Sequence, residues 1–509
     1  MRRRDFLRTV GCTTAALLAG CETETTTRTT KPSPHVRKRR KRSPVKTPAS
    51  RPPNVLWLIS EDTCPDMGCY GNPLVKTPNI DRLATEGARF TNAFVTAPVC
   101  SASRSCFMTG MYQTSIGAHN HRSHRTDGYM LPAPAAVITE YFRRAGYFTC
   151  NCEGLSYKKP GKTDWNFTPT APAFDGTDWS QRKAGQPFFA QINFNMTHRT
   201  FQRDKANPVD PARVELPPCY PDHPLARRDW ANYLESIQVL DSEIGIALQW
   251  LQKEGELDNT IIVYFADNGQ PHVRGKQWLY ESGIHVPLIV RWPGRVQAGT
   301  VVDDLVSTVD LAPTFLTAIG VEPPKHLQGY DFLSEKKRTR EYVFAARDRC
   351  DGTVDRIRCI RSKQYKYIRN YCPDRPYTQF NAYKKLQYPV LTLMQVLHKE
   401  GKLTADQEKF MAATRPPVEF YDVQEDPHEL RNLADDPKHK KALQVHSRKL
   451  DEWLEATADQ GRTPEDPKII EQEQNQMAAS FIDAMEKRDL SPTVSDEGYL
   501  KWWEQKLLV

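Results

Sequence analysis

The sequence predicts an α/β fold with a mostly parallel central sheet flanked by helices, followed by a smaller α+β domain that contains an antiparallel sheet. Continuous apolar runs of strand length at residues 55–59, 188–194 and 261–265, with helical patterns between them, predict the larger part. A change near residue 336 to shorter, more polar strand-like runs predicts the smaller part. We therefore expect domains at residues 54–335 and 336–509.

Helical patterns occupy residues 79–90, 135–147 and 227–255. The longest of them spaces its apolar residues for one buried stripe, formed by Tyr233, Ile237, Leu240, Ile244, Leu248 and Leu251. In parallel α/β sheets, ligands bind beyond the carboxyl ends of the strands. The residues that directly follow each apolar run are therefore candidates for a functional site.

The basic residues are concentrated at the start of the chain. The formal net charge is +8, but the excess lies within residues 1–52 and the remainder is nearly neutral, which argues against a nucleic-acid partner. Arg3 and Arg4 precede a short apolar run that ends in LLAGC, which resembles a twin-arginine signal with a bacterial lipobox. We expect a signal at residues 1–21 and a disordered basic Thr/Pro-rich linker at 22–53.

These features imply an exported bacterial protein in the periplasm or at the cell surface. The twin-arginine translocase would be a partner, and a lipid on Cys21 would anchor the chain to the membrane. The apolar run before Cys21 is much shorter than the roughly 20 residues that span a bilayer.

Four oxygen-bearing side chains follow two of the apolar runs. Glu61 and Asp62 come after residues 55–59, and Asp267 and Asn268 come after residues 261–265. Hard cations favour such ligands, whereas zinc normally recruits histidine or cysteine. Either pair alone is also typical of a loop end or a helix cap. Both pairs together predict a site for Ca²⁺, with Mg²⁺ as the alternative.

Cys100 begins a stretch that predicts a loop entering a helix. Ser101 and Ser103 suit the first helical turn, whose free N–H groups favour an anion. Arg104 adds a positively charged guanidinium whose N–H donors can bind two oxygens at once. Cys100 would then lie where an oxyanion meets the metal, as a ligand itself. The alternative is an inert core cysteine, which is the commoner role of a lone cysteine.

At these residues the chain resembles the type I sulfatases, a family of the alkaline phosphatase superfamily. Their nucleophile motif Cys-x-Pro/Ala-x-Arg reads CSASR at Cys100–Arg104. The resemblance extends from residue 54 to about residue 437 and includes GCYGNPLVKTPNIDRLATEGARFTNAF, ADNG, YESGIHVPLIVRWPG and EFYDVQEDPHELRNLA. Heparan N-sulfatase-like members are the most similar, because DNGQPHVRGK keeps a cation nine residues after Asp267.

The resemblance implies an alkaline-phosphatase-like fold and a nucleophile made from Cys100. A maturase would oxidise this cysteine to formylglycine, whose hydrated aldehyde attacks sulfur with one hydroxyl and expels sulfate with the other. Ala102 stands where proline is commoner, so the aerobic and the anaerobic maturase both remain candidates.

The resemblance also assigns roles around the sulfate. Arg104, Lys276 and Lys162 would supply positive charge, with Lys158 or Lys159 as alternatives to Lys162. Asp164 stands where the family usually has histidine, and it would bind substrate. His198 would contact sulfate or protonate the leaving group. His119 and His121 would bind and recognise the substrate. The competing interpretation is a surface lysine for Lys276, a structural loop histidine for His198, and surface histidines for His119 and His121.

We expect an enzyme that hydrolyses sulfate esters or N-sulfate groups, with a sulfated saccharide as substrate. A phosphodiesterase or phosphonate hydrolase of the same superfamily is the first alternative. The second is a tethered binder of sulfated glycans that lacks turnover because Cys100 stays a thiol.

Overall fold

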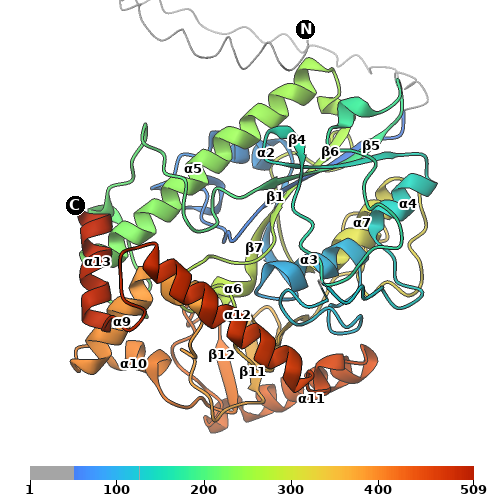
Figure 1. The fold of residues 1–509 in the computed structure, drawn as a ribbon. Coiled ribbons are helices and arrows are strands. Elements are labelled where there is room, and N and C mark those ends of the chain that lie inside the picture. Colours follow the sequence, from blue (N-terminus) through green and yellow to red (C-terminus); the bar gives the residue numbers. More distant parts are fainter. Residues whose placement is uncertain (1–50, 125) are drawn as a thin grey trace, which may run out of the picture. The chain divides into compact units, whose positions relative to one another are not determined.

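The computed structural model describes residues 51–124 and 126–509 (Figure 1). The predicted signal with Cys21 and nearly all of the predicted linker lie outside the described residues. Residues 52–509 form one compact unit. Within the described ranges, no helix is both long enough and apolar enough to span a membrane.

An eight-stranded sheet forms the centre of this unit, with the strand order β4-β3-β5-β1-β6-β7-β2-β8. Only β4 and β7 run against the common direction, which confirms the predicted mostly parallel sheet. The strands are β1 Asn54–Ser60, β2 Ala88–Phe94, β3 Phe148–Glu153, β4 Ser156–Pro160, β5 Phe188–Phe194, β6 Thr260–Ala266, β7 His285–Arg291 and β8 Thr300–Ser307.

The three strands that the apolar runs predict lie side by side at the middle of the sheet. All residues of β1, β5 and β6 are buried, as expected for strands covered on both faces. Ser60, the last residue of β1, pairs with Phe194 of β5 and with Ala266 of β6. The residues that follow these three strands therefore emerge together at one edge of the sheet.

Helices cover both faces of the large sheet (Figure 1). Helices α2 (Pro78–Glu86) and α5 (Pro224–Lys253) pack together, and α3 (Cys100–Thr109), α4 (Ile138–Arg144) and α7 (Leu311–Ala318) form a second group. The predicted apolar stripe of α5 is buried along its length. The short helix α6 (Glu281–Ile284) precedes β7.

The prediction of one helix through residues 79–90 was wrong at its end. The helix stops at Glu86, and the following residues form strand β2. Gly87 lies against the backbone of β7, where a Cβ atom would come within 2.3 Å of the carbonyl oxygen of Val290. This close approach requires glycine and separates the helix from the strand.

The C-terminal part contains the predicted antiparallel sheet, in the order β12-β11-β10-β9. Its strands are β9 Val343–Arg347, β10 Ile357–Arg361, β11 Tyr365–Asn370 and β12 Val418–Asp422. Its helices are α8 Ala382–Gln387, α9 Pro389–Lys399, α10 Ala405–Met411, α11 Lys440–Ala456, α12 Pro467–Glu486 and α13 Asp496–Leu508. Helix α11 packs on this sheet, whereas α9 and α13 reach back to α5.

Candidate active site

The acidic residues after β1 and β6 converge at the edge of the large sheet. The backbone N–H of Asp62 donates to Asp267 Oδ1 at 3.1 Å, and the N–H of Thr63 donates to the carbonyl of Asn268 at 2.9 Å. Glu61 is 5% exposed, and Asp62, Asp267 and Asn268 are fully buried. Like-charged groups this close and this buried require compensating positive charge.

The donor set fits a hard divalent cation. Ligand atoms of Glu61, Cys100 and Asp267 all lie within 4.8 Å of one another. Asn268 donates its amide N–H to Asp62 Oδ1 at 2.9 Å, while its own amide oxygen is buried without a hydrogen-bond partner among the described residues. Carboxylate oxygens beside an unpartnered amide oxygen are the ligands that Ca²⁺ prefers.

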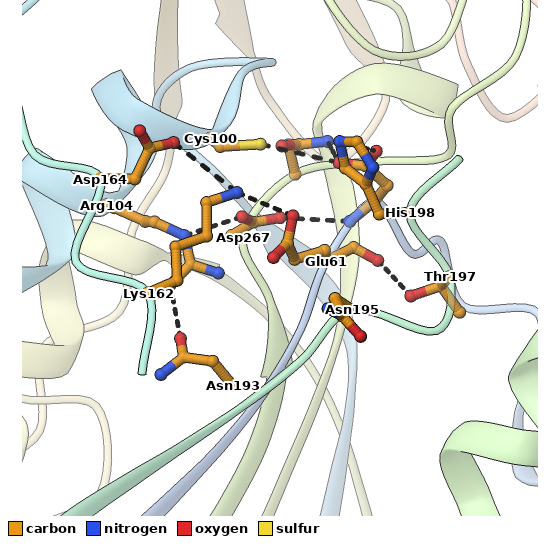
Figure 2. A network of polar contacts seen from close by, with 12 residues as sticks. Glu61, Cys100, Arg104, Lys162, Asp164, Asn193, Asn195, Thr197, His198 and Asp267 are labelled. Atoms are coloured by element: carbon orange, nitrogen blue, oxygen red, sulfur yellow. Dashed lines mark hydrogen bonds and ion pairs between the residues drawn. The ribbon is translucent and has the colours of Figure 1, made fainter. Parts of the chain in front are cut away.

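Three basic side chains each pair with one of the three carboxylates (Figure 2 shows two of these pairs). Lys162 Nζ lies 2.7 Å from Glu61 Oε2, Lys276 Nζ lies 2.7 Å from Asp62 Oδ1, and Arg104 Nε lies 2.9 Å from Asp267 Oδ2. Burial opposes the charge of Lys276, but the carboxylate of Asp62 raises the pKa of this ammonium well above its usual value. The site therefore keeps its cations charged at neutral pH.

Cys100 is the first residue of α3 and lies between these groups. Its Sγ lies 3.3 Å from Lys276 Nζ and 3.8 Å from Asp62 Oδ1. Burial, with the neighbouring charge of Asp267, raises the pKa of the Cys100 thiol to about 12. An unmodified Cys100 is therefore a neutral thiol at neutral pH, which is a poor nucleophile.

His198 reaches the same centre from the loop after β5. Its Nδ1 lies 2.7 Å from the carbonyl oxygen of Arg199, which can only accept, so Nδ1 carries the proton of this hydrogen bond. Its Nε2 faces Asp62, with Oδ2 at 3.9 Å. Arg199 fixes the loop by donating to both carboxylate oxygens of the buried Asp229, at 2.7 and 2.6 Å. His198 thus presents a defined ring nitrogen to the site.

Comparison with known protein families identifies the chain. The sulfatase profile matches residues 53–321, which is more than half of the sequence. An overlapping profile, described as N-sulphoglucosamine sulphohydrolase, C-terminal, matches residues 272–385. The chain belongs to the sulfatase family.

Relatives that match over most of their length support this membership. An ulvan-active sulfatase of Formosa agariphila is 34% identical to this sulfatase over 464 residues, which cover 81% of this chain and 76% of the relative. Human N-sulphoglucosamine sulphohydrolase is 26% identical over 464 residues, covering 81% of this chain and 91% of the human protein. The predicted family and the predicted enzyme class, a sulfatase, are confirmed.

Solved structures share the fold of this sulfatase at lower identity. A protein solved in complex with its substrate, D-glucosamine-2-N,6-O-disulfate, superposes with a TM-score of 0.59 at 19% identity, covering 80% of this chain and 98% of that chain. A phosphonate monoester hydrolase of Silicibacter pomeroyi superposes with a TM-score of 0.58 at 20% identity, covering 80% of this chain and 96% of that chain. The fold alone therefore does not separate sulfate from phosphonate chemistry.

Lys162 and Asp164 of the sulfatase lie together beside Glu61. Lys162 Nζ is 3.6 Å from Asp164 Oδ2, and both side chains are largely buried (Figure 2). Lys158 and Lys159, the alternatives to Lys162, are exposed on strand β4. Lys162 is thus the lysine of this segment that pairs with a carboxylate of the site.

Of the two histidines after α3, His121 contacts the C-terminal part of the sulfatase. His121 Nδ1 lies 3.1 Å from Asp351 Oδ1, and its Nε2 is buried without a hydrogen-bond partner among the described residues. His119 is half-buried, and burial lowers the pKa of its imidazole. The charge of Asp348 acts against this lowering, whereas that of Arg358 adds to it.

Ser101 and Ser103 do lie in the first turn of α3, as predicted. Ser101 Oγ accepts from the backbone N–H of Arg122 at 3.0 Å and so holds the loop that follows α3. Although burial opposes the charge of Arg122, Asp164 and Asp351 raise the pKa of its guanidinium. The serine hydroxyl thus fixes a neighbouring loop.

Sequence reasoning missed Asn193, Arg122 and Tyr383. Asn193 lies within β5 and accepts from Arg104 Nη1 at 2.6 Å, which orients the guanidinium. The sequence did contain a signal for Asn193, because it is a polar residue within the apolar run at residues 188–194. Arg122 and Tyr383 belong to no motif that the sequence analysis used, and only folding brings them beside the site.

Proposed function

We propose that this sulfatase hydrolyses sulfate esters or N-sulfate groups of a sulfated saccharide, through a formylglycine made from Cys100 and with a bound divalent cation. The observation that carries the proposal is the position of Cys100 between an acidic oxygen cluster and three basic side chains, Arg104, Lys162 and Lys276. The relatives that act on ulvan and N-sulphoglucosamine, by their names, support a saccharide substrate.

Glu61, Asp62, Asp267 and Asn268 would hold the cation, together with the group at position 100. Formylglycine in its hydrated form supplies a hydroxyl nucleophile, and a divalent cation supplies a Lewis acid beside it. A neutral Cys100 thiol does not supply such a nucleophile, which is why the modification is part of the proposal.

The remaining chemistry falls to the chain's own side chains. Arg104, Lys162 and Lys276 are fixed by ion pairs, so their charges are preorganised for the negative charge that concentrates on the sulfuryl oxygens. Arg104 Nη2 is buried without a hydrogen-bond partner among the described residues, which leaves a donor for a sulfate oxygen. His198 presents Nε2. In its imidazolium form, which carries a proton on both ring nitrogens, it would protonate the leaving oxygen or nitrogen from Nε2 and return to the neutral ring.

Maturation must precede folding in this proposal. Every residue of Cys100–Arg104 is at most 2% exposed, so an enzyme that reads this linear motif reaches it only in an unfolded chain. Export of an already folded protein by the twin-arginine translocase, followed by a lipid anchor at Cys21, is compatible with this order. We therefore propose conversion in the cytoplasm and activity in the periplasm or at the cell surface.

Mass spectrometry of the Cys100 peptide tests the modification. Protein from the native host should carry the mass loss that replacing CH₂–SH by CHO produces, and Cys100→Ala should abolish sulfate release while keeping the fold. An active enzyme with an unmodified thiol, or an active Cys100→Ala variant, would refute the proposed nucleophile.

The shared fold keeps phosphonate hydrolysis as the second candidate function. Aryl esters that differ only in the sulfate, phosphonate or phosphodiester group decide between the two. We expect the largest kcat/KM for the sulfate ester, and a strong preference for the phosphonate would favour the second candidate.

A further inference from the structure

Tyr383 brings a phenol ring from the C-terminal part into the catalytic centre. It lies in α8, far from the large sheet in sequence. Its ring centroid is 5.7 Å from that of His198, and the Lys276 ammonium lies 5.4 Å from the same centroid. Tyr383 therefore contacts the histidine that faces the leaving group and the lysine that touches Cys100.

The Tyr383 hydroxyl has no hydrogen-bond partner among the described residues, although its oxygen is buried. Most buried hydroxyls are paired, because a buried hydroxyl without a hydrogen-bond partner destabilises the fold. Burial also raises the pKa of Tyr383 well above its usual value, so the hydroxyl remains a donor at every working pH. Such a group is suited to a partner that arrives with the substrate.

The start of α8, the helix that carries Tyr383, is held in place by a chain of polar contacts. Asn381 caps α8 by accepting from the N–H of Lys384 at 3.0 Å, and it donates its amide to Asp351 Oδ2 at 3.1 Å. The other oxygen of Asp351 bonds to His121, whose loop follows α3. The helix that carries the tyrosine is thereby tied to the loop after the nucleophile helix, and the ring itself packs against His198 and Lys276.

We propose that the Tyr383 hydroxyl forms a hydrogen bond with the saccharide that carries the sulfate, and that it selects saccharide sulfates over sulfates without ring hydroxyls. The inference rests on the proposed function. Arg104, Lys162 and Lys276 already surround the sulfate position, whereas Tyr383 packs against His198, the group that faces the leaving atom. A neutral donor at that place suits a sugar hydroxyl or ring oxygen.

Tyr383→Phe removes the hydroxyl and keeps the ring. The substrates are 4-nitrophenyl sulfate and the saccharide that the wild-type enzyme desulfates fastest among N-sulfated and O-sulfated glucosamines and ulvan oligosaccharides. We expect kcat/KM to fall about tenfold for the saccharide and to change less than about twofold for the aryl sulfate. Deoxy analogues of the saccharide then identify the partner, because the matching analogue should lose no further activity in the variant.

Tyr377→Phe is the matched control. The Tyr377 hydroxyl donates to Glu419 at 3.0 Å, and its ring packs against Trp278 and Phe410. A structural defect there should lower both rates in proportion and leave the ratio of the two substrates unchanged.

Two outcomes would overturn the inference alone. They are an unchanged saccharide rate in Tyr383→Phe, or an equal fall for both substrates while the wild-type enzyme remains active. A wild-type enzyme that releases no sulfate from any ester would instead overturn the proposed function, and this inference with it.

Discussion

The ammonium of Lys276 lies 2.7 Å from Asp62 Oδ1 and 3.3 Å from Cys100 Sγ. One buried cation thus joins the acidic cluster to the residue at the start of α3. Lys276→Met should lower kcat for 4-nitrophenyl sulfate by about 10²–10³-fold, because it removes a preorganised charge from the developing sulfuryl oxygens. Steady-state kinetics measures this, with the exposed Lys402→Met as the control. A kcat within threefold of wild type would contradict the role of Lys276.

Removal of divalent cations should abolish activity and lower thermal stability. Ca²⁺ added back to chelator-treated enzyme should raise the Tm, because it binds only the folded acidic cluster. Asn268→Ala removes one oxygen donor and should increase the Ca²⁺ concentration at half-maximal Tm shift by about 10- to 100-fold. Asn195→Ala changes an exposed amide near the site and should leave that concentration unchanged. A Tm that does not respond to Ca²⁺ would argue against a cation site here.

His198→Ala should affect substrates according to their leaving groups. Loss of the proton donor should lower kcat/KM by about 10²–10⁴-fold for a saccharide sulfate, and much less for an aryl sulfate that leaves as a stable anion. Across a series of aryl sulfates, log kcat/KM should depend more steeply on leaving-group basicity than in the wild type. Tyr383→Phe should keep the wild-type slope, which separates the two residues. An unchanged slope in His198→Ala would contradict its role as an acid.

Acid should destabilise the loop that carries His198. Arg199 donates to the buried His272 Nδ1 at 3.0 Å, so this nitrogen must be unprotonated, and burial lowers the pKa of His272 from 6.5 to about 4. A group whose pKa is lower in the folded state than in the unfolded state stabilises the fold at pH values above the unfolded pKa. For His272, this contribution is lost as the pH falls from 6.5 to 4. We expect the titration of His272 to lower the free energy of unfolding by up to about 3 kcal/mol over this pH range.

Urea unfolding at several pH values measures this loss. His272→Gln keeps an acceptor for Arg199 without the titration, so its unfolding free energy should depend less on pH between 6.5 and 4. Asp229, whose pKa Arg199 lowers to about 2 against the effect of burial, adds a further loss only below about pH 4. Equal slopes for wild type and His272→Gln would refute this account.

The sequence predicts the centre of the fold well because β1, β5 and β6 are buried on both faces and read as apolar runs. Strand β8 is only partly buried, and β2 alternates, so neither shows this signal. The acids after β1 and β6 were recognisable because they follow these runs directly. Tyr383 was not, because its place beside His198 depends on how the C-terminal part packs.

Reaction chemistry and saccharide choice thus reside in different stretches of the polypeptide. The groups around Cys100 come from the ends of the large sheet and from α3, whereas Tyr383 comes from α8, held by Asn381. Substitutions within α8, residues 382–387, should therefore change which sugar the enzyme accepts while bond cleavage is retained. Grafting this short segment between homologous enzymes is the corresponding engineering route.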